Sequence, residues 1–323
     1  MPLLDVQDLH ASFVIRQGTV RAVDGVSFTL EEGESLGLVG ESGCGKTTAA
    51  LSLLRLLPPN GRIDSGKILY QGRDVLTFNA EEVRRFRWKE ISIIFQGAMN
   101  ALNPVQRVGD QIAEAIRLHQ PISQKEAGKQ AQALLERVEL EGRRINDYPH
   151  EFSGGQRQRV MIAMALACRP RIVIGDEPTT ALDVMVQAQI FELVESLRKE
   201  LGMAMILITH DLSVLGDTCD RAAVMYAGQI VEIGPIEILF QSPCHPYARC
   251  LLRSFPRLQG PRSMADSIPG TPPNLIEVPP GCRFHPRCQE VMAICSREQP
   301  LLLERGPRHN VACHLYGKGI DDA

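Results

Sequence analysis

The sequence predicts an α/β fold with a mixed sheet core, an antiparallel β subdomain and an inserted helical subdomain. The central observation is the pattern G-x-x-x-x-G-K-T at Gly40–Thr47, which follows a short apolar run, Ser35–Val39, and precedes a helical pattern, Thr47–Leu57. Strand, glycine-rich loop and helix in this order are typical of a phosphate-binding loop. Two later apolar runs, Ile172–Gly175 and Ala204–Thr209, have the length and composition of buried strands.

The segments around this core follow in order. Short runs of alternating apolar and polar residues precede it and predict antiparallel strands. From Gly109 to about Arg144 apolar residues recur at helical spacing, and Pro121 separates two helices. After Gly234 prolines crowd the chain, and few regular elements are expected there. We predict a nucleotide-binding domain at 1–235, with a helical subdomain at about 97–165, and a loop-rich extension at 236–323.

Composition narrows the class of protein. The net charge is −3, with 35 basic and 38 acidic residues, so no nucleic-acid partner is predicted. No apolar run approaches the roughly 20 residues that a membrane-spanning helix needs, and the first residues do not resemble a signal peptide. The chain is therefore expected to be soluble and cytosolic. Its nine cysteines are better explained as thiols and a metal or cluster site than as disulfides.

The glycine-rich loop predicts triphosphate binding. Its backbone N–H groups wrap the phosphates at the positive end of the following helix, Lys46 reaches the β- and γ-phosphates, and the Thr47 hydroxyl is placed for Mg²⁺. A chance glycine-rich turn is the alternative, but the flanking strand and helix argue against it. Cys44 stands where serine is commoner, and we expect its contacts to be through the backbone. The expected ATP-binding residues of the loop are Ser42, Gly43, Cys44, Gly45, Lys46, Thr47 and Thr48.

Acidic side chains at a strand end predict hydrolysis of the bound triphosphate. Asp176 and Glu177 directly follow the apolar strand, where ligand sites of α/β folds form. Asp176 is placed to hold Mg²⁺, and Glu177 to orient and deprotonate the attacking water. His210 follows the next strand and can contact the γ-phosphate. A helix-entry acid and a structural histidine are the alternatives, and each would be favoured if the residue stood alone.

A second anion site is predicted at Phe152–Gln156. Ser153 can cap the helix that follows, and Gly154 and Gly155 expose its first N–H groups. This site has no place on the nucleotide that the glycine-rich loop binds. We therefore expect it to meet a second nucleotide across a dimer interface.

Together these motifs resemble the ATP-binding-cassette (ABC) ATPases. The segment Ser153–Gln156 resembles their signature, Gln96 the Q-loop glutamine, Asp176–Thr179 the extended Walker B, Ala181–Asp183 the D-loop and His210–Asp211 the switch histidine. The resemblance implies a head-to-tail dimer with two ATP sites, in which the phosphate loop of one chain meets the signature of the other.

The same resemblance assigns further roles by position. Phe13 lies near the aromatic residue that stacks on adenine. Thr47, Gln96 and Asp176 would hold Mg²⁺. Glu177, His210 and Gln96 would act in catalysis. The residues that reach the partner chain's ATP are Ser153, Gly154, Gly155, Gln156 and Asp183.

The C-terminal part resembles the oligopeptide and dipeptide importer ATPases, through Ser242–Tyr247 and Gly281–Cys288. This implies import of di- or oligopeptides, or alternatively of nickel, glutathione or another small solute. It implies a second, related ATPase in a heterodimer, or a homodimer, beneath two transmembrane permease subunits served by an external solute-binding protein. The chain would lie peripherally on the cytoplasmic face of the cell (inner) membrane. For His245–Tyr247 a plain surface turn is the alternative.

Four cysteines in the extension have the spacing C-x5-C-x6-C-x17-C, at Cys282, Cys288, Cys295 and Cys313. Four thiolates suit Zn²⁺ or an iron–sulfur cluster, and the short C-x2-C of most zinc sites is absent. Resemblance to the dipeptide-importer ATPases favours a [4Fe–4S] cluster; zinc and unligated thiols are the alternatives.

Three other functions are alternatives to that of an importer ATPase. A cassette ATPase acting on DNA or ribosomes commonly has two cassettes or a long coiled-coil insert, and this chain has neither. An exporter ATPase is usually fused to membrane helices. A redox-sensing subunit would use the cysteine site as its working part.

Overall fold

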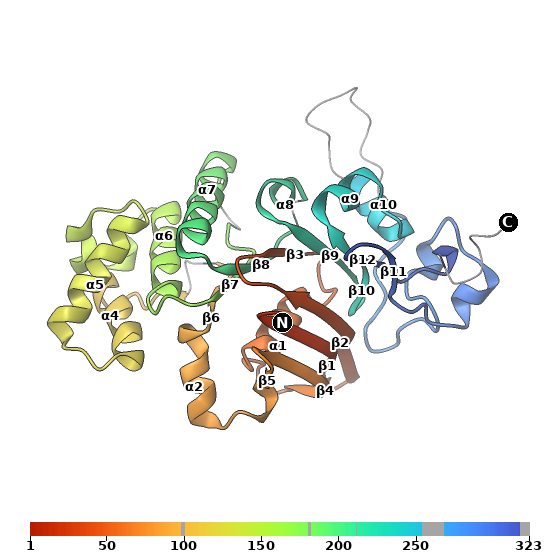
Figure 1. The fold of residues 1–323 in the computed structure, drawn as a ribbon, viewed down its shortest axis with the longest axis horizontal. Helices are drawn as coiled ribbons and strands as arrows, with labels where there is room; N and C mark the ends of the chain where they lie inside the picture. Colours follow the sequence, from red (N-terminus) through yellow and green to blue (C-terminus); the bar gives the residue numbers. More distant parts are fainter. Residues whose placement is uncertain (98–100, 180–181, 211, 254–267, 317–323) are drawn as a thin grey trace. The chain divides into compact units, whose positions relative to one another are not determined.

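The computed structural model describes residues 1–97, 101–179, 182–210, 212–253 and 268–316 (Figure 1). The chain forms two compact units. Unit 1 comprises Met1–Leu30, Leu36–Leu76 and Thr209–Ala323, and unit 2 comprises Glu31–Ser35 and Thr77–Ile208. The predicted α/β class with antiparallel and mixed sheets is confirmed. The predicted domain bounds 1–235, 97–165 and 236–323 stay predictions.

Unit 1 begins with an antiparallel sheet of strand order β2-β1-β4-β5. The alternating runs near the N-terminus form two long strands with bulges rather than several short ones, because register shifts near Leu9 keep the apolar side chains on one face. Leu4 pairs with both Leu30 and Tyr70. The strands are β1 (Leu4–Ile15), β2 (Gly18–Leu30), β4 (Gly61–Tyr70) and β5 (Arg73–Asp74).

A second group of strands in unit 1 has the order β11-β12-β10-β9-β3. β3 pairs with β9 in parallel, and β9 and β10 form a hairpin whose turn residues, Ala227 and Gly228, both have positive φ. The extension adds its own two strands to β10, which the proline-rich sequence did not predict. These strands are β3 (Ser35–Val39), β9 (Arg221–Tyr226), β10 (Gln229–Pro235), β11 (Leu303–Gly306) and β12 (His309–Val311).

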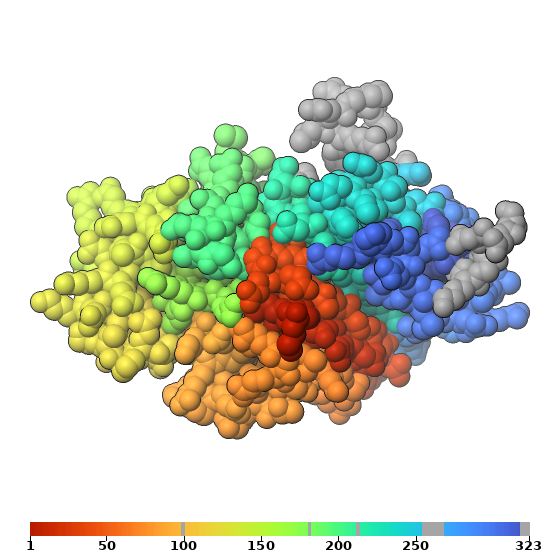
Figure 2. Space-filling view, in the orientation of Figure 1, coloured from red at the N-terminus to blue at the C-terminus, as the bar shows by residue number. Residues whose placement is uncertain are grey.

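The helices of unit 1 are short. The predicted helix after the glycine-rich loop is α1, which begins at Lys46 as soon as the loop ends. Figure 2 shows the cyan segment with α9 and α10 and the blue extension meeting on one surface. The helices are α1 (Lys46–Leu53), α8 (Leu212–Thr218), α9 (Ile236–Gln241) and α10 (Pro246–Arg253), with 3-10 turns at Val75–Thr77, His285–Arg287, Ala293–Ser296 and His314–Tyr316.

Unit 2 combines three parallel strands, in the order β8-β7-β6, with amphipathic helices. The strands are β6 (Ile91–Ile94), β7 (Ile172–Asp176) and β8 (Ala204–Ile208). The helices are α2 (Ala80–Lys89), α4 (Val108–His119), α5 (Gln124–Arg137), α6 (Gly154–Ala165) and α7 (Val184–Leu201), with 3-10 turns at Gly142–Asn146 and Pro149–Glu151.

Caps set the helix boundaries of unit 2. Asn79, Ser123, Ser153 and Asp183 each stand before a helix and accept hydrogen bonds from its first N–H groups. Gly202 ends α7 with φ 63°. The helices α4 and α5 lie on either side of Pro121, as predicted, and their apolar faces share one core with α6, α7 and β7.

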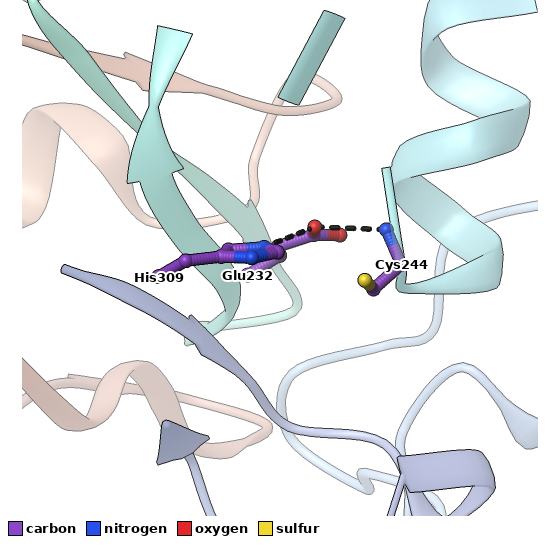
Figure 3. A group of neighbouring side chains, drawn as sticks. All are labelled: Glu232, Cys244 and His309. Atoms are coloured by element: carbon purple, nitrogen blue, oxygen red, sulfur yellow. Dashed lines mark hydrogen bonds and ion pairs between the residues drawn. The ribbon is translucent and has the colours of Figure 1, made fainter. Parts of the chain in front are cut away.

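The extension is fixed to β10 through the carboxylate of Glu232, which is fully buried (Figure 3). One oxygen accepts the N–H of Cys244 at 2.8 Å and lies 2.9 Å from Nε2 of His309; the other accepts the N–H of His245 at 2.7 Å. These partners come from β12 and from the residues just before α10. One side chain therefore joins three segments of unit 1.

Glu232, Cys244 and His309 also have three metal-ligand atoms within 4.8 Å of one another. Hydrogen bonds already occupy both carboxylate oxygens, however. Burial, together with the charge of Glu232, raises the pKa of the Cys244 thiol and keeps it protonated. We therefore interpret the group as a hydrogen-bonded anchor rather than a metal site.

Replacing Glu232 by alanine is expected to destabilise the protein by about 2–4 kcal/mol, because two buried N–H groups and a histidine lose their acceptor. Glu232→Gln keeps an acceptor and should cost less. Urea unfolding of the full-length chain measures both. Glu304→Ala, at an exposed position of β11, is the matched control and should change little; an equal effect of Glu232→Ala and Glu304→Ala would contradict the anchoring role.

Candidate functional site

The glycine-rich loop is formed in unit 1 between β3 and α1. Its glycines Gly40, Gly43 and Gly45 have φ of 154°, 78° and 107°. A side chain at Gly45 would collide with the carbonyl oxygen of Ala22. The glycine at that position is therefore required both by its φ and by the close approach of β2.

Lys46 lies inside the loop and is only 6% exposed. Its ammonium donates to the carbonyl oxygens of Gly40 at 2.7 Å and Glu41 at 3.1 Å. The loop thus holds a cation at its centre, beside the first turn of α1, where backbone N–H groups lack intrahelical acceptors. Thr47 and Thr48 belong to that turn, and Ser42 and Thr47 are exposed. The role of these residues in binding phosphates stays a prediction.

Cys44 is buried, with 5% of its surface exposed. Its sulfur lies 3.6 Å from the Lys46 ammonium, and its carbonyl oxygen accepts the N–H of Gly228 at 2.8 Å. Burial raises the pKa of its thiol. The side chain therefore packs under the loop.

In unit 2, Gln96 and Glu177 come together. Both follow parallel neighbouring strands, β6 and β7, so they emerge at the same edge. The Gln96 amide donates to a carboxylate oxygen of Glu177 at 2.8 Å. Glu177 has φ 44°, a rare conformation for a residue with a side chain, and its N–H donates to the carbonyl oxygen of Ile208 at 2.9 Å. Asp176, the last residue of β7, is 3% exposed.

The signature segment forms the capped start of α6. The Ser153 hydroxyl accepts the N–H of Gln156 at 3.3 Å, and the Gln156 side-chain oxygen accepts the N–H of Ser153 at 3.1 Å. At Gly155 a Cβ would lie 2.6 Å from a methyl group of Val186. Gly154 is the first residue of the helix. The N-terminus of α6 thus carries a polar turn in which Gly155 leaves no room for a side chain.

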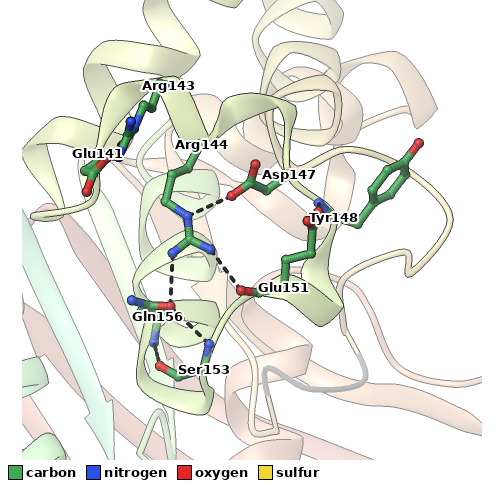
Figure 4. A network of polar contacts seen from close by, with 8 residues as sticks. All are labelled: Glu141, Arg143, Arg144, Asp147, Tyr148, Glu151, Ser153 and Gln156. Atoms are coloured by element: carbon green, nitrogen blue, oxygen red, sulfur yellow. Dashed lines mark hydrogen bonds and ion pairs between the residues drawn. The ribbon is translucent and has the colours of Figure 1, made fainter.

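Arg144 holds this segment in place, and no local sequence pattern predicted its role (Figure 4). Its guanidinium donates to Gln156 at 3.1 Å, to Asp147 at 2.8 Å and to the carbonyl oxygen of Glu151 at 2.9 Å. It also lies 3.9 Å from the centre of the Phe152 ring. A single arginine therefore orients both the side chain and the backbone of the signature turn.

The other predicted site residues that the structure describes are Asp183, Phe13 and His210. Asp183 caps α7 and accepts the N–H of Val186 at 3.0 Å. Phe13 is half-buried in β1 and its ring lies against Gly61. His210 is exposed after β8. Ala181 of the D-loop and Asp211, which follows the histidine, lie outside the described residues.

The segment His245–Tyr247 is not a surface turn, in contrast to the alternative considered from sequence. His245 is 1% and Tyr247 0% exposed. Burial lowers the pKa of His245 to about 3, so its ring is neutral, and Nδ1 accepts the N–H of Tyr247 at 3.0 Å. The ring of Tyr247 packs against Tyr226 and Phe284, with centroids 4.6 and 5.3 Å away.

The four cysteines of the extension lie close enough together that a negative charge on one sulfur would raise the pKa of neighbouring thiols. The N–H of Cys282 donates to the carbonyl oxygen of Cys295 at 2.8 Å. Burial and the neighbouring thiols raise the pKa of Cys282, of Cys288 and of Cys313, the last to about 12. Among described residues, no three of the four sulfurs lie within 4.8 Å of one another.

Comparison with known proteins assigns the family. A model described as "ABC transporter" matches residues 23–180, and one described as "Oligopeptide/dipeptide transporter, C-terminal region" matches residues 231–295. The dipeptide transport ATP-binding protein DppD of Bacillus subtilis is 47% identical over 324 residues, which cover 99% of this chain and 97% of the relative. The chain belongs to the ABC transporter ATP-binding proteins.

Other comparisons agree with this ABC ATPase assignment. The oligopeptide transport ATP-binding protein OppD of Escherichia coli is 49% identical over 301 residues, covering 93% of this chain and 89% of the relative. The dimeric structure of a bacterial ABC transporter cassette superimposes with a TM-score of 0.65 at 27% identity, covering 72% of this chain and 98% of that chain. No helix in the described part of this ABC ATPase is long and apolar enough to cross a membrane.

Replacing Arg144 by alanine is expected to lower steady-state ATP hydrolysis about tenfold, because Gln156 and the turn before Ser153 lose charge-assisted hydrogen bonds. The neighbouring Arg143→Ala is the control: Arg143 is 85% exposed and pairs only with the exposed Glu141 among the contacts described. Hydrolysis is measured with the unfolding midpoint of each variant. Equal hydrolysis by the two variants would contradict the role of Arg144.

Proposed function

We propose that this chain is the ATP-hydrolysing subunit that drives import of dipeptides or oligopeptides across the cytoplasmic membrane. The observation that carries the proposal is similarity over nearly the whole chain to two proteins named for dipeptide and oligopeptide transport. That similarity includes the extension, which lies outside the segment matched by the general ABC model. Nickel or glutathione import is the alternative.

Hydrolysis in this proposal uses Glu177 as the base that takes a proton from the attacking water. The 2.8 Å hydrogen bond from Gln96 supports a positioning role for the glutamine. His210 contacts the γ-phosphate, and Phe13 stacks on the adenine. Thr47, Gln96 and Asp176 offer oxygen atoms, the donors that Mg²⁺ prefers, and the bound ion would neutralise charge on the phosphates.

The ATP site is completed by a second chain in this proposal. Two subunits meet head to tail, so that Ser153, Gly154, Gly155 and Gln156 of one face the triphosphate held by the loop of the other. The capped N-terminus of α6 supports this role, because its N–H groups favour an anion. Asp183, at the N-terminus of α7, joins the same interface.

The partners follow from the same family assignment. The second cassette is a related ATPase, giving a heterodimer, or an identical chain. Two transmembrane permease subunits bind the pair, and an external solute-binding protein delivers the peptide. The chain then lies on the cytoplasmic face of the inner membrane as a peripheral subunit.

We propose that Cys282, Cys288, Cys295 and Cys313 hold a [4Fe–4S] cluster. Four thiols that share one neighbourhood match the four-thiolate ligand set of such a cluster. The bound cluster would supply crosslinks to a segment in which the described residues form only short turns and strands.

Glu177→Gln is expected to reduce ATP hydrolysis by about 100-fold or more and to abolish ATP-driven uptake, because an amide cannot accept the water proton. The measurement uses the complete transporter in proteoliposomes supplied with a dipeptide, an oligopeptide, nickel or glutathione. Glu192→Gln, at an exposed position of α7, is the control. Uptake of nickel or glutathione but of neither peptide would refute the peptide assignment, and undiminished hydrolysis by Glu177→Gln would refute the base.

Protein purified without oxygen should show the visible absorbance of an iron–sulfur cluster, with iron and sulfide in equal amounts. Cys313→Ser should lose this absorbance, because one of four ligands is removed, whereas Cys168→Ser should keep it. Elemental analysis separates the alternatives: stoichiometric zinc, or no metal in protein kept anaerobic throughout, would count against the cluster.

A further inference from the structure

Glu41, the second residue of the phosphate loop, is bound by the C-terminal extension at two points. Its carboxylate forms a bidentate pair with Arg287, with Nη1 and Nη2 at 2.7 and 3.0 Å from the two oxygens. Its backbone N–H donates to the Tyr247 hydroxyl at 2.9 Å. The carbonyl oxygen of the same residue accepts from Lys46. Every polar group of Glu41 thus has a partner, and two of the three partner side chains belong to the extension or to the helix that leads into it.

Arg287 is itself held rigidly. Its side chain is 5% exposed, and it also donates to the carbonyl oxygen of Pro269 at 2.6 Å and to the Tyr226 hydroxyl at 3.2 Å. Phe284 packs edge-on against Tyr226 at 5.2 Å between centroids. A planar guanidinium fixed in this way can hold a carboxylate in one orientation, which a flexible surface pair does not achieve.

We infer that Arg287 and Tyr247 are positioning residues for the phosphate loop: they fix Glu41 and, through it, the cradle around Lys46. Their effect has two parts. The hydrogen bonds keep the first turn of the loop in the shape that binds phosphates. The charge of Arg287 neutralises the carboxylate of Glu41, which lies within the loop that binds the triphosphate. The inference rests on ATP binding by this chain and does not depend on which solute is transported.

The position of Arg287 in the sequence gives this contact a further meaning. Arg287 directly precedes Cys288, and Arg283 in the same segment pairs with Asp24 of β2 and donates to the carbonyl oxygen of Ala227. The segment that carries two of the four clustered cysteines is therefore the segment that holds the phosphate loop. We therefore expect that a substitution that displaces this segment also weakens the binding of ATP.

The test measures the Kd of the purified full-length chain for a fluorescent ATP analogue with Mg²⁺. Arg287→Met is expected to weaken binding about tenfold, and Tyr247→Phe about threefold, as for the loss of a charge-assisted and of a neutral hydrogen bond. Arg287→Lys keeps the positive charge but cannot form the bidentate pair, so its Kd should lie between those of the wild type and Arg287→Met. In steady-state hydrolysis KM should rise while kcat changes little.

Arg249→Met is the matched control. It breaks another arginine–carboxylate pair within the extension, with Glu290 at 2.8 Å, and a hydrogen bond to the carbonyl oxygen of Cys244 at 3.0 Å; neither contact involves the loop. Its Kd should stay within about twofold of wild type, the scatter expected for a partly exposed pair. Equal Kd values for Arg249→Met and Arg287→Met would overturn the inference.

A charge rescue distinguishes positioning from general damage. Because Arg287→Met leaves the Glu41 carboxylate unpaired beside the phosphates, Glu41→Gln in the same chain should restore the Kd to within about threefold of wild type. A double variant that binds as weakly as Arg287→Met, or weaker, would overturn the inference. If Arg287→Met does not fold, Arg287→Gln, which is also uncharged but polar, gives the same comparison with and without Glu41→Gln.

Discussion

The buried carboxylate of Glu232 is the interaction on which the C-terminal half of unit 1 depends. It accepts the N–H groups at the start of the segment that leads into α10 and meets His309 of β12. With these segments fixed, Tyr247 points its hydroxyl at the phosphate loop. A buried carboxylate is costly to desolvate, and here that cost is offset because both of its oxygens have hydrogen-bond partners.

Two arginines, four positions apart in the extension, also form ion pairs within unit 1, and one of these pairs involves the phosphate loop. Arg283 pairs with Asp24 and Arg287 with Glu41, and their side chains are 6% and 5% exposed. Such pairs are sensitive to geometry, since removing one partner leaves a buried charge. The extension is thus part of the framework of the nucleotide site rather than an independent appendage.

Local features of this fold could be read from sequence, and distant contacts could not. The strand Ser35–Val39, the loop after it, and the cap Ser153 depend on neighbouring residues, and each was found where predicted. Arg287 and Glu41 are separated by 246 residues, so no spacing rule connects them. Arg144 lies 12 residues from Gln156 in a short 3-10 turn, and no sequence pattern connects the two residues either.

The pairing of β12 with β10 also protects a sheet edge. β10 is buried almost along its length, and without β12 its free N–H and C=O groups would offer a template for pairing with other molecules. The ladder instead ends at β11, a strand of four residues that carries Glu304 and Arg305. A short charged edge discourages further strand addition, so the extension also helps to keep separate copies of this ATPase from aggregating through their backbones.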